Sequence, residues 1–265
     1  MSRKAPLLSR RRTAGALALL TTVLALGYPG SAWAAATQSD TQTVSSNAIS
    51  IPGVATSSAG GIAIPGLAIA LGIPPIVVQG NIQVDTTGNV NNVQDATNDV
   101  TIDQQTVAAA GSATASNGGV ATSGIATASS TAIVMQMNIQ VITGFAPVGG
   151  VTQTASNIGD IDQTTGAASG NTDADCEGST ATSGNAAAHS STVLNQSNVQ
   201  TYRGSPNDTA GATQMSAANT AASVQHIIAA TGIASAAGGG TANSGNASNT
   251  ATTDIDQQND QTANE

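Results

Sequence analysis

The feature that most constrains this chain is a short amide motif that recurs at a nearly constant interval. The pattern Gln-x-Asn-x-Gln begins at Gln79, Gln136, Gln196 and Gln257, so successive copies are almost evenly spaced. Ahead of the last three copies, the segments ATSGIA, ATSGNA and ANSGNA each place a glycine at the same distance before the leading glutamine. A repeat of this kind is typical of stacked units, each of which completes the core of its neighbours.

A second motif family lies between these copies. The segments VQDATNDVTIDQ, TQTASNIGDIDQ and TQMSAANTAASVQ share a glutamine near the start and a closing glutamine at Gln104, Gln163 or Gln225. Each of these closing glutamines lies near the middle of an interval between two Gln-x-Asn-x-Gln motifs, so it divides that interval into two near-equal halves. The sequence therefore predicts about six units of roughly 30 residues each, a period typical of solenoids, in a repeat region that covers 93–265.

Residues 1–34 have the three parts of a secretory signal peptide. A start with five Lys or Arg residues is followed by an apolar run at 14–27 and by small residues before a cleavage site after Ala34. A membrane-spanning helix needs about 20 apolar residues, and Pro29-Gly30 ends this run early. We expect export, a processed chain without a membrane span, and a secreted, extracellular or cell-surface location.

The charge of the remaining chain removes several classes of partner. After cleavage one basic residue, Arg203, is left beside 15 Asp and Glu residues. A nucleic-acid-binding surface needs clustered basic side chains, usually with stacking aromatics, and attraction to anionic lipid also needs basic residues. We therefore expect no nucleic-acid partner. The single cysteine, Cys176, excludes an intramolecular disulfide framework.

Strands are favoured over helices along the repeats. Ala is interleaved with Thr, Ser, Asn and Gly, which are poor residues in helix interiors. Segments such as TAIVMQMNIQV and STVLNQSNVQTY instead alternate in polarity and are rich in β-branched residues, with glycine-rich runs between them. The predicted fold class is all-β, either a β-solenoid or a stack of β-arches.

Two segments before the repeat region differ from it. Residues 35–50 are polar, and we expect them to be flexible. Residues 51–92 open like a repeat, since GVATS at Gly53 returns at Gly119, and then continue as an apolar run broken by Pro and Gly. Proline excludes a central strand and a spanning helix. We interpret 51–92 as an atypical first unit, either a cap or an apolar self-association patch.

A row of uncharged amides suits a stacked structure. Stacked strands lie about 4.8 Å apart, so an Asn or Gln repeated at one position can donate to one neighbour and accept from the other. A charge repeated in the same way would repel itself. We predict an amide ladder with these members: Gln79, Asn81, Gln83, Gln104, Gln136, Asn138, Gln140, Gln163, Gln196, Asn198, Gln200, Gln225, Gln257, Asn259 and Gln261.

These repeats also resemble a known family. The Gln-Gly-Asn at 79–81, the spaced glutamines and asparagines, the Ser/Ala/Gly filling and the leader together resemble the curlin repeats of secreted amyloid fibre subunits. The resemblance covers the repeats after Gln79. It implies a secreted subunit that assembles with copies of itself into β-rich fibres at the cell surface.

Candidate catalytic and metal-binding groups are sparse. The two histidines lie in different half-units, without a neighbouring Cys or His at ligand spacing. The alternating pairs Asp160/Asp162 and Asp254/Asp256 would each share one strand face, where they could hold Ca²⁺ or act as a glycosidase pair. A solvated face whose charges limit lateral aggregation is the simpler interpretation. We expect no enzyme activity, no cofactor and no bound metal.

Three interpretations of function remain open. The first is a secreted structural protein whose repeats stack into a β-rich fibre or surface layer, with its own copies and cell-surface or matrix components as partners. The second is an extracellular binding module, an adhesin or an ice-binding-like β-solenoid. The third is a disordered secreted polypeptide, because low hydrophobicity can prevent a core from forming. The regular repeat spacing favours the first.

Overall fold

The structure is a computed structural model, and the described part of it is all-β. It describes these residues: 34–51, 53–57, 61–86, 92–144, 150–204 and 213–264. The predicted signal peptide, apart from Ala34, lies outside the described residues. Within the described ranges every regular element is a strand, from β1 to β17. The predicted fold class is therefore confirmed.

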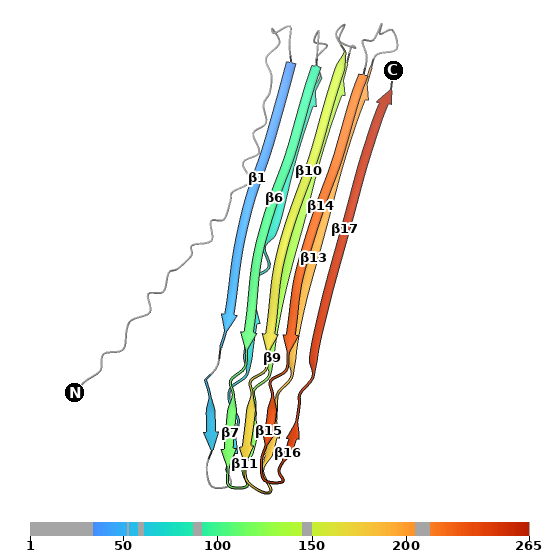
Figure 1. The fold of residues 1–265 in the computed structure, drawn as a ribbon. Coiled ribbons are helices and arrows are strands. Elements are labelled where there is room, and N and C mark those ends of the chain that lie inside the picture. Colours follow the sequence, from blue (N-terminus) through green and yellow to red (C-terminus); the bar gives the residue numbers. More distant parts are fainter. Residues whose placement is uncertain are drawn as a thin grey trace, which may run out of the picture.

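The chain winds through four coils, and each coil visits four parallel sheets in the same order. The first and last sheets, A and D, contain long strands that lie side by side (Figure 1). A strand as long as β6 spans about 60 Å, so each coil is a long, narrow loop. Sheet A consists of β1 (Ala34–Ser50), β6 (Asn92–Ala109), β10 (Val151–Ala168) and β14 (Thr213–Ala230). Sheet D consists of β4 (Ala68–Leu71), β5 (Ile76–Asp85), β9 (Ala126–Thr143), β13 (Ala186–Arg203) and β17 (Ala247–Asn264).

Two short sheets, B and C, form the end of each loop, where the chain turns from sheet A towards sheet D (Figure 1). Buried alanines from the two short sheets pack against each other. Sheet B consists of β2 (Ala55–Ser57), β7 (Ala113–Ser116), β11 (Thr172–Asp175) and β15 (Ala234–Ala236). Sheet C consists of β3 (Ile62–Ala63), β8 (Val120–Thr122), β12 (Thr180–Thr182) and β16 (Thr241–Asn243).

The repeat units expected from the sequence are the two layers of one coil. Strand partners in adjacent coils are 57 residues apart for Gln79 and Gln136 and 62 residues apart for Gln163 and Gln225. One half of each coil supplies sheet A and the other half supplies sheet D. A long strand can bury its inner face only under a second strand of similar length, so neither half closes a coil by itself.

The first coil contains residues 35–50 and 51–92, and it differs from the later coils. The segment 35–50, expected to be flexible, lies within β1, which pairs with β6 along its whole length. The segment 51–92 supplies β2 to β5 and so completes the first coil. Gly72–Pro75 separates β4 from β5, where each later coil has one continuous strand. Proline lacks the N–H that a ladder hydrogen bond requires, which explains the interruption.

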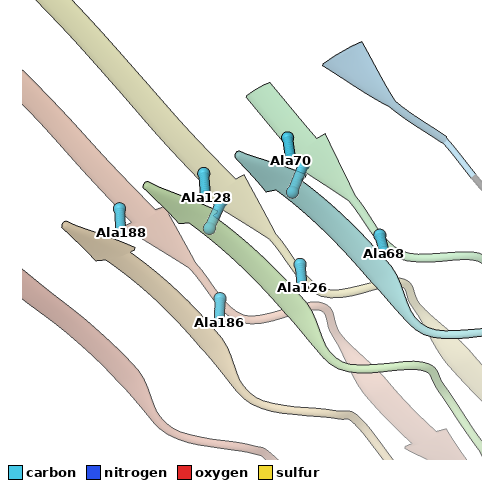
Figure 2. Packing of buried hydrophobic residues seen from close by; sticks show 8 residues of the cluster. Ala68, Ala70, Ala126, Ala128, Ala186 and Ala188 are labelled. Carbon is cyan, nitrogen blue, oxygen red and sulfur yellow. The ribbon is translucent and has the colours of Figure 1, made fainter. Parts of the chain in front are cut away.

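The core is a thin layer between the inner faces of sheets A and D. Side chains along the long strands of the two middle coils alternate between buried and exposed or half-buried positions, as in β9 and β13. Near the short sheets the inner positions of sheet D are alanines stacked on successive strands (Figure 2), and these are Ala68, Ala70, Ala126, Ala128, Ala186 and Ala188. Larger residues such as Val134, Ile161 and Leu194 fill the middle, and Tyr202 packs with Ile142 near the far end.

Glycines form columns at the corners of the coils. A Cβ on Gly170 would overlap the backbone oxygen of Gly111 in the preceding coil, and a Cβ on Gly184 would overlap that of Gly124. The recurring Ser-Gly pair also joins coils by a hydrogen bond, since the backbone N–H of Gly184 donates to Ser123 Oγ at 2.6 Å. Only glycine lets successive corners approach this closely. The fixed position of the Ser-Gly pair in the sequence follows from this contact.

Candidate functional site

The most distinctive feature of the interior is a row of asparagines, here called the asparagine ladder. It runs through all four coils along the middle of the long strands and takes residues alternately from sheets D and A. The five members that are not in the last coil are at most 6% exposed. The ladder consists of Asn81, Asn98, Asn138, Asn157, Asn198, Asn219 and Asn259.

Every hydrogen bond along the asparagine ladder points in one direction. Asn138 Nδ2 donates to Oδ1 of Asn157 at 3.0 Å and to Oδ1 of Asn198 at 2.9 Å, and both acceptors lie further towards the C-terminal coil. Asn138 Oδ1 accepts from Asn81 and from Asn98. The same Nδ2 also donates to the backbone oxygen of Ser156 at 3.0 Å. Each interior amide is therefore satisfied as donor and as acceptor, which a buried polar group requires.

Two glutamine columns flank the asparagine ladder in sheet D, and their hydrogen bonds run the opposite way. In the first column, Gln136 Nε2 donates to Gln79 Oε1 at 2.7 Å, and Gln196 donates to Gln136 at 2.8 Å. Gln257 donates to Gln196 at 2.6 Å. The second column, formed by Gln83, Gln140, Gln200 and Gln261, has the same polarity with distances of 2.9, 2.8 and 2.6 Å.

Sheet A contributes further glutamines. Gln163 Nε2 donates to Gln104 Oε1 at 2.8 Å, and Gln225 donates to Gln163 at 3.2 Å. Gln163 Oε1 also accepts from Ser190 and Thr192 of sheet D, so this column joins the two sheets. All fifteen residues proposed for the amide ladder from the sequence thus lie in four columns, three in sheet D and one in sheet A.

Sequence reasoning missed the sheet A half of the asparagine ladder. Asn98, Asn157 and Asn219 each lie six residues before the closing glutamine of their segment. This constant, even offset places each asparagine on the same strand face as that glutamine, and it was the signal available in the sequence. A shorter glutamine column, Gln94 and Gln153, was also missed.

The shorter column ends at a mismatch. Gln153 Nε2 donates to Gln94 Oε1 at 2.9 Å, but Gln153 Oε1 is buried without a hydrogen-bond partner among the described residues. The position that follows in the fourth coil is Met215, which has no N–H to donate from its side chain. An unsatisfied buried acceptor costs about 1–3 kcal/mol, so this end of sheet A is a weak point of the interior.

The acidic pairs and the histidines lie on the outer faces, away from the ladders. Asp162 lies in register with Asp103, and Asp160 lies beside Thr101. These carboxylates are exposed, as are Asp254 and Asp256 on β17 and the two histidines. In the described ranges no three His, Cys, Asp or Glu side chains gather as a metal site would require. The same ranges contain no helix of the length and apolarity needed to cross a membrane.

Comparison with known proteins adds no relative. The chain matches no protein-family model, no curated protein sequence and no solved structure. Its function is therefore inferred from the coils themselves, and above all from the asparagine ladder and the two ends at which the ladder stops.

Proposed function

We propose that this chain is a secreted, non-enzymatic structural protein whose coils stack with the coils of other copies into a β-rich fibre or surface layer outside the cell. One observation carries the proposal. The asparagine ladder and its flanking glutamine columns run through every described coil and reach the first and last coils with open hydrogen-bonding groups. A stack built in this way has no internal reason to stop at four coils.

The strand edges at both ends support the same conclusion. β1, β4 and β5 pair on one side only, with strands of the second coil, and β14 and β17 pair on one side only, with strands of the third. Natural sheets block such edges with proline, with charged side chains, above all lysine, with bulges or with a covering segment. Neither β14 nor β17 contains a proline or a lysine, and every residue of β17 is exposed. The aspartates of β17 are the only charged side chains on these two strands apart from His226 of β14 when it is protonated, and long, regular edges without proline or lysine favour pairing with another copy.

Because the interior is thin and built of small side chains, stacking on neighbouring copies would stabilise the end coils. Much of the core is alanine, which buries little apolar area and contributes little at about 25 cal/mol per Å². Two of the four coils are end coils with one neighbour each. In a stack of many copies every coil has two neighbours. Backbone and amide hydrogen bonds then replace the apolar contacts that a thicker core would supply.

The leader and the curlin-like character of the repeats also support this proposal. To test it, the chain recovered after export is incubated at several concentrations and followed by circular dichroism, amyloid-dye fluorescence and sedimentation. We expect a β-sheet spectrum, dye binding and sedimentable fibres that increase with time. A β-sheet monomer that persists for days at high concentration would contradict the proposal, and a random-coil spectrum at every concentration would favour disorder.

One specific observation favours the alternative of a binding module. The outer face of sheet D carries an apolar patch in the first two coils, where Ile76, Val78 and Val84 are 62%, 49% and 59% exposed and Met135 and Met137 continue the patch. Large exposed apolar patches are typical of interaction surfaces. Ice binding is less favoured because regular threonine rows are lacking: one outer column of sheet A, for example, reads Thr41, Asp99, Ile158, Thr220.

The two functions can be separated by changing this apolar face alone. The variant Val78→Ser with Met135→Ser and Met137→Ser leaves the inner amide columns unchanged, because all three side chains point outward. An adhesin should lose adsorption to apolar beads in this variant. A fibre subunit that stacks through its coil ends should retain fibre growth. Matched substitutions on the polar outer face of β13, such as Asn195→Ser, provide the control.

A further inference from the structure

We propose that copies of this chain join head to tail, with the fourth coil of one copy stacked on the first coil of the next so that the asparagine ladder and the two glutamine columns of sheet D continue across the joint. The inference rests on the proposed fibre function and adds to it the partner surface, the polarity and the chemistry of the joint. The N-end is defined as the open edge of β1 to β5, and the C-end as the open edge of β14 to β17.

The parallel sheets determine how copies can continue the stack. All strand pairs of the described coils are parallel and in register. Adding one more coil in the same way places β14 of one copy beside β1 of the next, and β17 beside β4 and β5. In that register Asn219 meets Asp40, and Asn259 meets Asn81.

The asparagine ladder has unlike groups at its two ends. Asn259 Oδ1 accepts from Asn198 at 2.9 Å and from Asn219 at 3.0 Å, while its Nδ2 donates to none of the described residues. At the N-end, Asn81 Oδ1 receives no hydrogen bond from the described residues. The position that is Asn98, Asn157 or Asn219 in later coils is Asp40 in the first coil.

Asp40 is suited to accept hydrogen bonds from the preceding copy, because the donors of that copy's asparagine ladder point towards its C-end. A carboxylate accepts hydrogen bonds and donates none. From the described residues its side chain receives only a 3.4 Å contact from Gln42. In the joint, the amide groups of Asn219 and Asn259 would donate to Asp40, and hydrogen bonds to a charged acceptor are stronger than those between neutral groups.

The glutamine columns match with the opposite polarity. At the C-end, Oε1 of Gln257 and Oε1 of Gln261 receive no hydrogen bond from the described residues. At the N-end, the Nε2 groups of Gln79 and Gln83 donate to the backbone oxygens of Asp99 at 2.8 Å and Asp95 at 2.7 Å. With no glutamine before them, they also donate to the backbone oxygens of Asp40 at 3.2 Å and Ala36 at 3.0 Å. Head-to-tail stacking would offer this second hydrogen the side-chain oxygen of Gln257 or Gln261 instead, whereas head-to-head or tail-to-tail contact would bring like groups together.

A glycine at the N-end provides an independent observation. In the A-to-B corner column, Gly111, Gly170 and Gly232 are each required because a Cβ would overlap the glycine of the preceding coil. Gly53 occupies this position in the first coil, and a Cβ there would meet nothing within 4 Å. Its backbone also has an ordinary φ that any residue adopts. Glycine is needed at this position only when the fourth coil of another copy, which carries Gly232 at the same corner, is stacked on the N-end.

The outer charges agree with this arrangement. The outward carboxylates of β17 are Asp254, Asp256 and Asp260, and the same register positions in the first coil are Ile76, Val78 and Ile82. Head-to-tail stacking therefore places no carboxylate of β17 directly beside another. Tail-to-tail contact would bring two acidic strands together, and like charges on neighbouring strands are destabilising.

Two variants each disable one end. Asn259→Asp keeps the acceptor that the fourth coil uses, but it removes the donor of the C-end and places a carboxylate opposite Asp40. Gly53→Val adds a side chain that is in open space within the chain but would overlap Gly232 of a stacked copy. Gln258→Glu adds the same charge to β17 on its outer face, and it is the matched control for Asn259→Asp.

The test uses the exported chain and compares each variant alone with an equimolar mixture, by sedimentation velocity and electron microscopy. We expect each end variant alone to remain monomeric, and the control to form fibres like the unchanged chain. The mixture should form a one-to-one dimer and nothing longer, because the intact C-end of Gly53→Val fits the intact N-end of Asn259→Asp. Adding Asp40→Asn to Asn259→Asp should restore fibres, because the new amide at position 40 can donate to the new carboxylate at position 259.

The joint and the proposed function fail in different ways. If the unchanged chain forms no fibre at all, the fibre function is wrong. If it forms fibres while Asn259→Asp or Gly53→Val alone does so equally well, or if the mixture stays monomeric, the head-to-tail joint is wrong and the fibre function stands.

Discussion

The same substitution made at two positions of the asparagine ladder should have very different costs. Asn138 is fully buried, and its Nδ2 donates at 2.9–3.0 Å to Asn157, to Asn198 and to the backbone oxygen of Ser156. In Asn138→Asp these three acceptors would face a carboxylate oxygen, and both amide hydrogens would be lost. The acceptor function of Oδ1 towards Asn81 and Asn98 would remain.

The expected loss in the free energy of unfolding follows from the number of amide hydrogens that are lost. Leaving a buried acceptor unsatisfied costs about 1–3 kcal/mol, so the loss of two shared hydrogens costs roughly 2–6 kcal/mol before the charge is considered. Breaking a buried charged arrangement so that one charge is left without a partner costs about 3–5 kcal/mol. The sum approaches the whole stability of a typical domain, about 5–15 kcal/mol. We therefore expect Asn138→Asp to be largely unfolded or to lose most of its stability.

Asn259→Asp is the matched control. Asn259 only accepts hydrogen bonds from the described residues, and it lies in exposed β17. Its stability should change by less than about 1 kcal/mol, the range for surface positions away from special features. The measurement is urea unfolding followed by far-ultraviolet circular dichroism, at concentrations at which sedimentation shows monomers. Equal losses at both positions, or no loss at Asn138, would refute the directional ladder.

Three further predictions concern the interior. Met215→Gln should raise the melting temperature by supplying the donor that Gln153 Oε1 lacks, a gain of about 1 kcal/mol. A lower melting temperature would show that the packing of Met215 against the cluster of Ile142, Val151 and Tyr202 outweighs this gain. Tyr202→Ala should destabilise the chain by about 3–5 kcal/mol in urea unfolding, as expected for a buried aromatic residue, and a change below about 1 kcal/mol would mean that Tyr202 is not packed. Gly170→Val should abolish cooperative thermal unfolding while Gly53→Val leaves it unchanged, because only Gly170 has a coil before it; similar melting curves would contradict the corner contact.

The sequence was sufficient for the parts of the fold that repeat with a constant offset. The copies of Gln-x-Asn-x-Gln differ in their neighbours, with Gly80, Met137, Ser197 and Gln258 between the same two amides. Those neighbours point outward and are free to vary, whereas the inward amides are held by the amides of adjacent coils. Alternation then implied strands, and the recurring Ser-Gly pair indicated a fixed position in each coil.

The sequence was insufficient where two segments with similar patterns have different positions. Inward amides of sheets A and D share one interior, so both halves of a coil carry Gln and Asn on one face. The spacing alone could therefore not show whether two successive units are the two layers of one coil or two separate coils. Residues 35–50 contain none of the repeated glutamines, since Ser46 replaces the residue equivalent to Gln104. Their polarity indicated flexibility, yet pairing along β6 satisfies one edge of their backbone and places Val44 against the core.

The most direct test of the account is a high-resolution structure of the fibre by electron cryomicroscopy. Four coils at about 4.8 Å each give a rise of about 19 Å per copy, and the asparagine side chains should form one unbroken column in which Asn259 of one copy contacts Asp40 and Asn81 of the next. A rise of about 4.8 Å per copy, with each chain spread in a single layer, would contradict the account, and so would fibres held together by contacts other than the two coil ends.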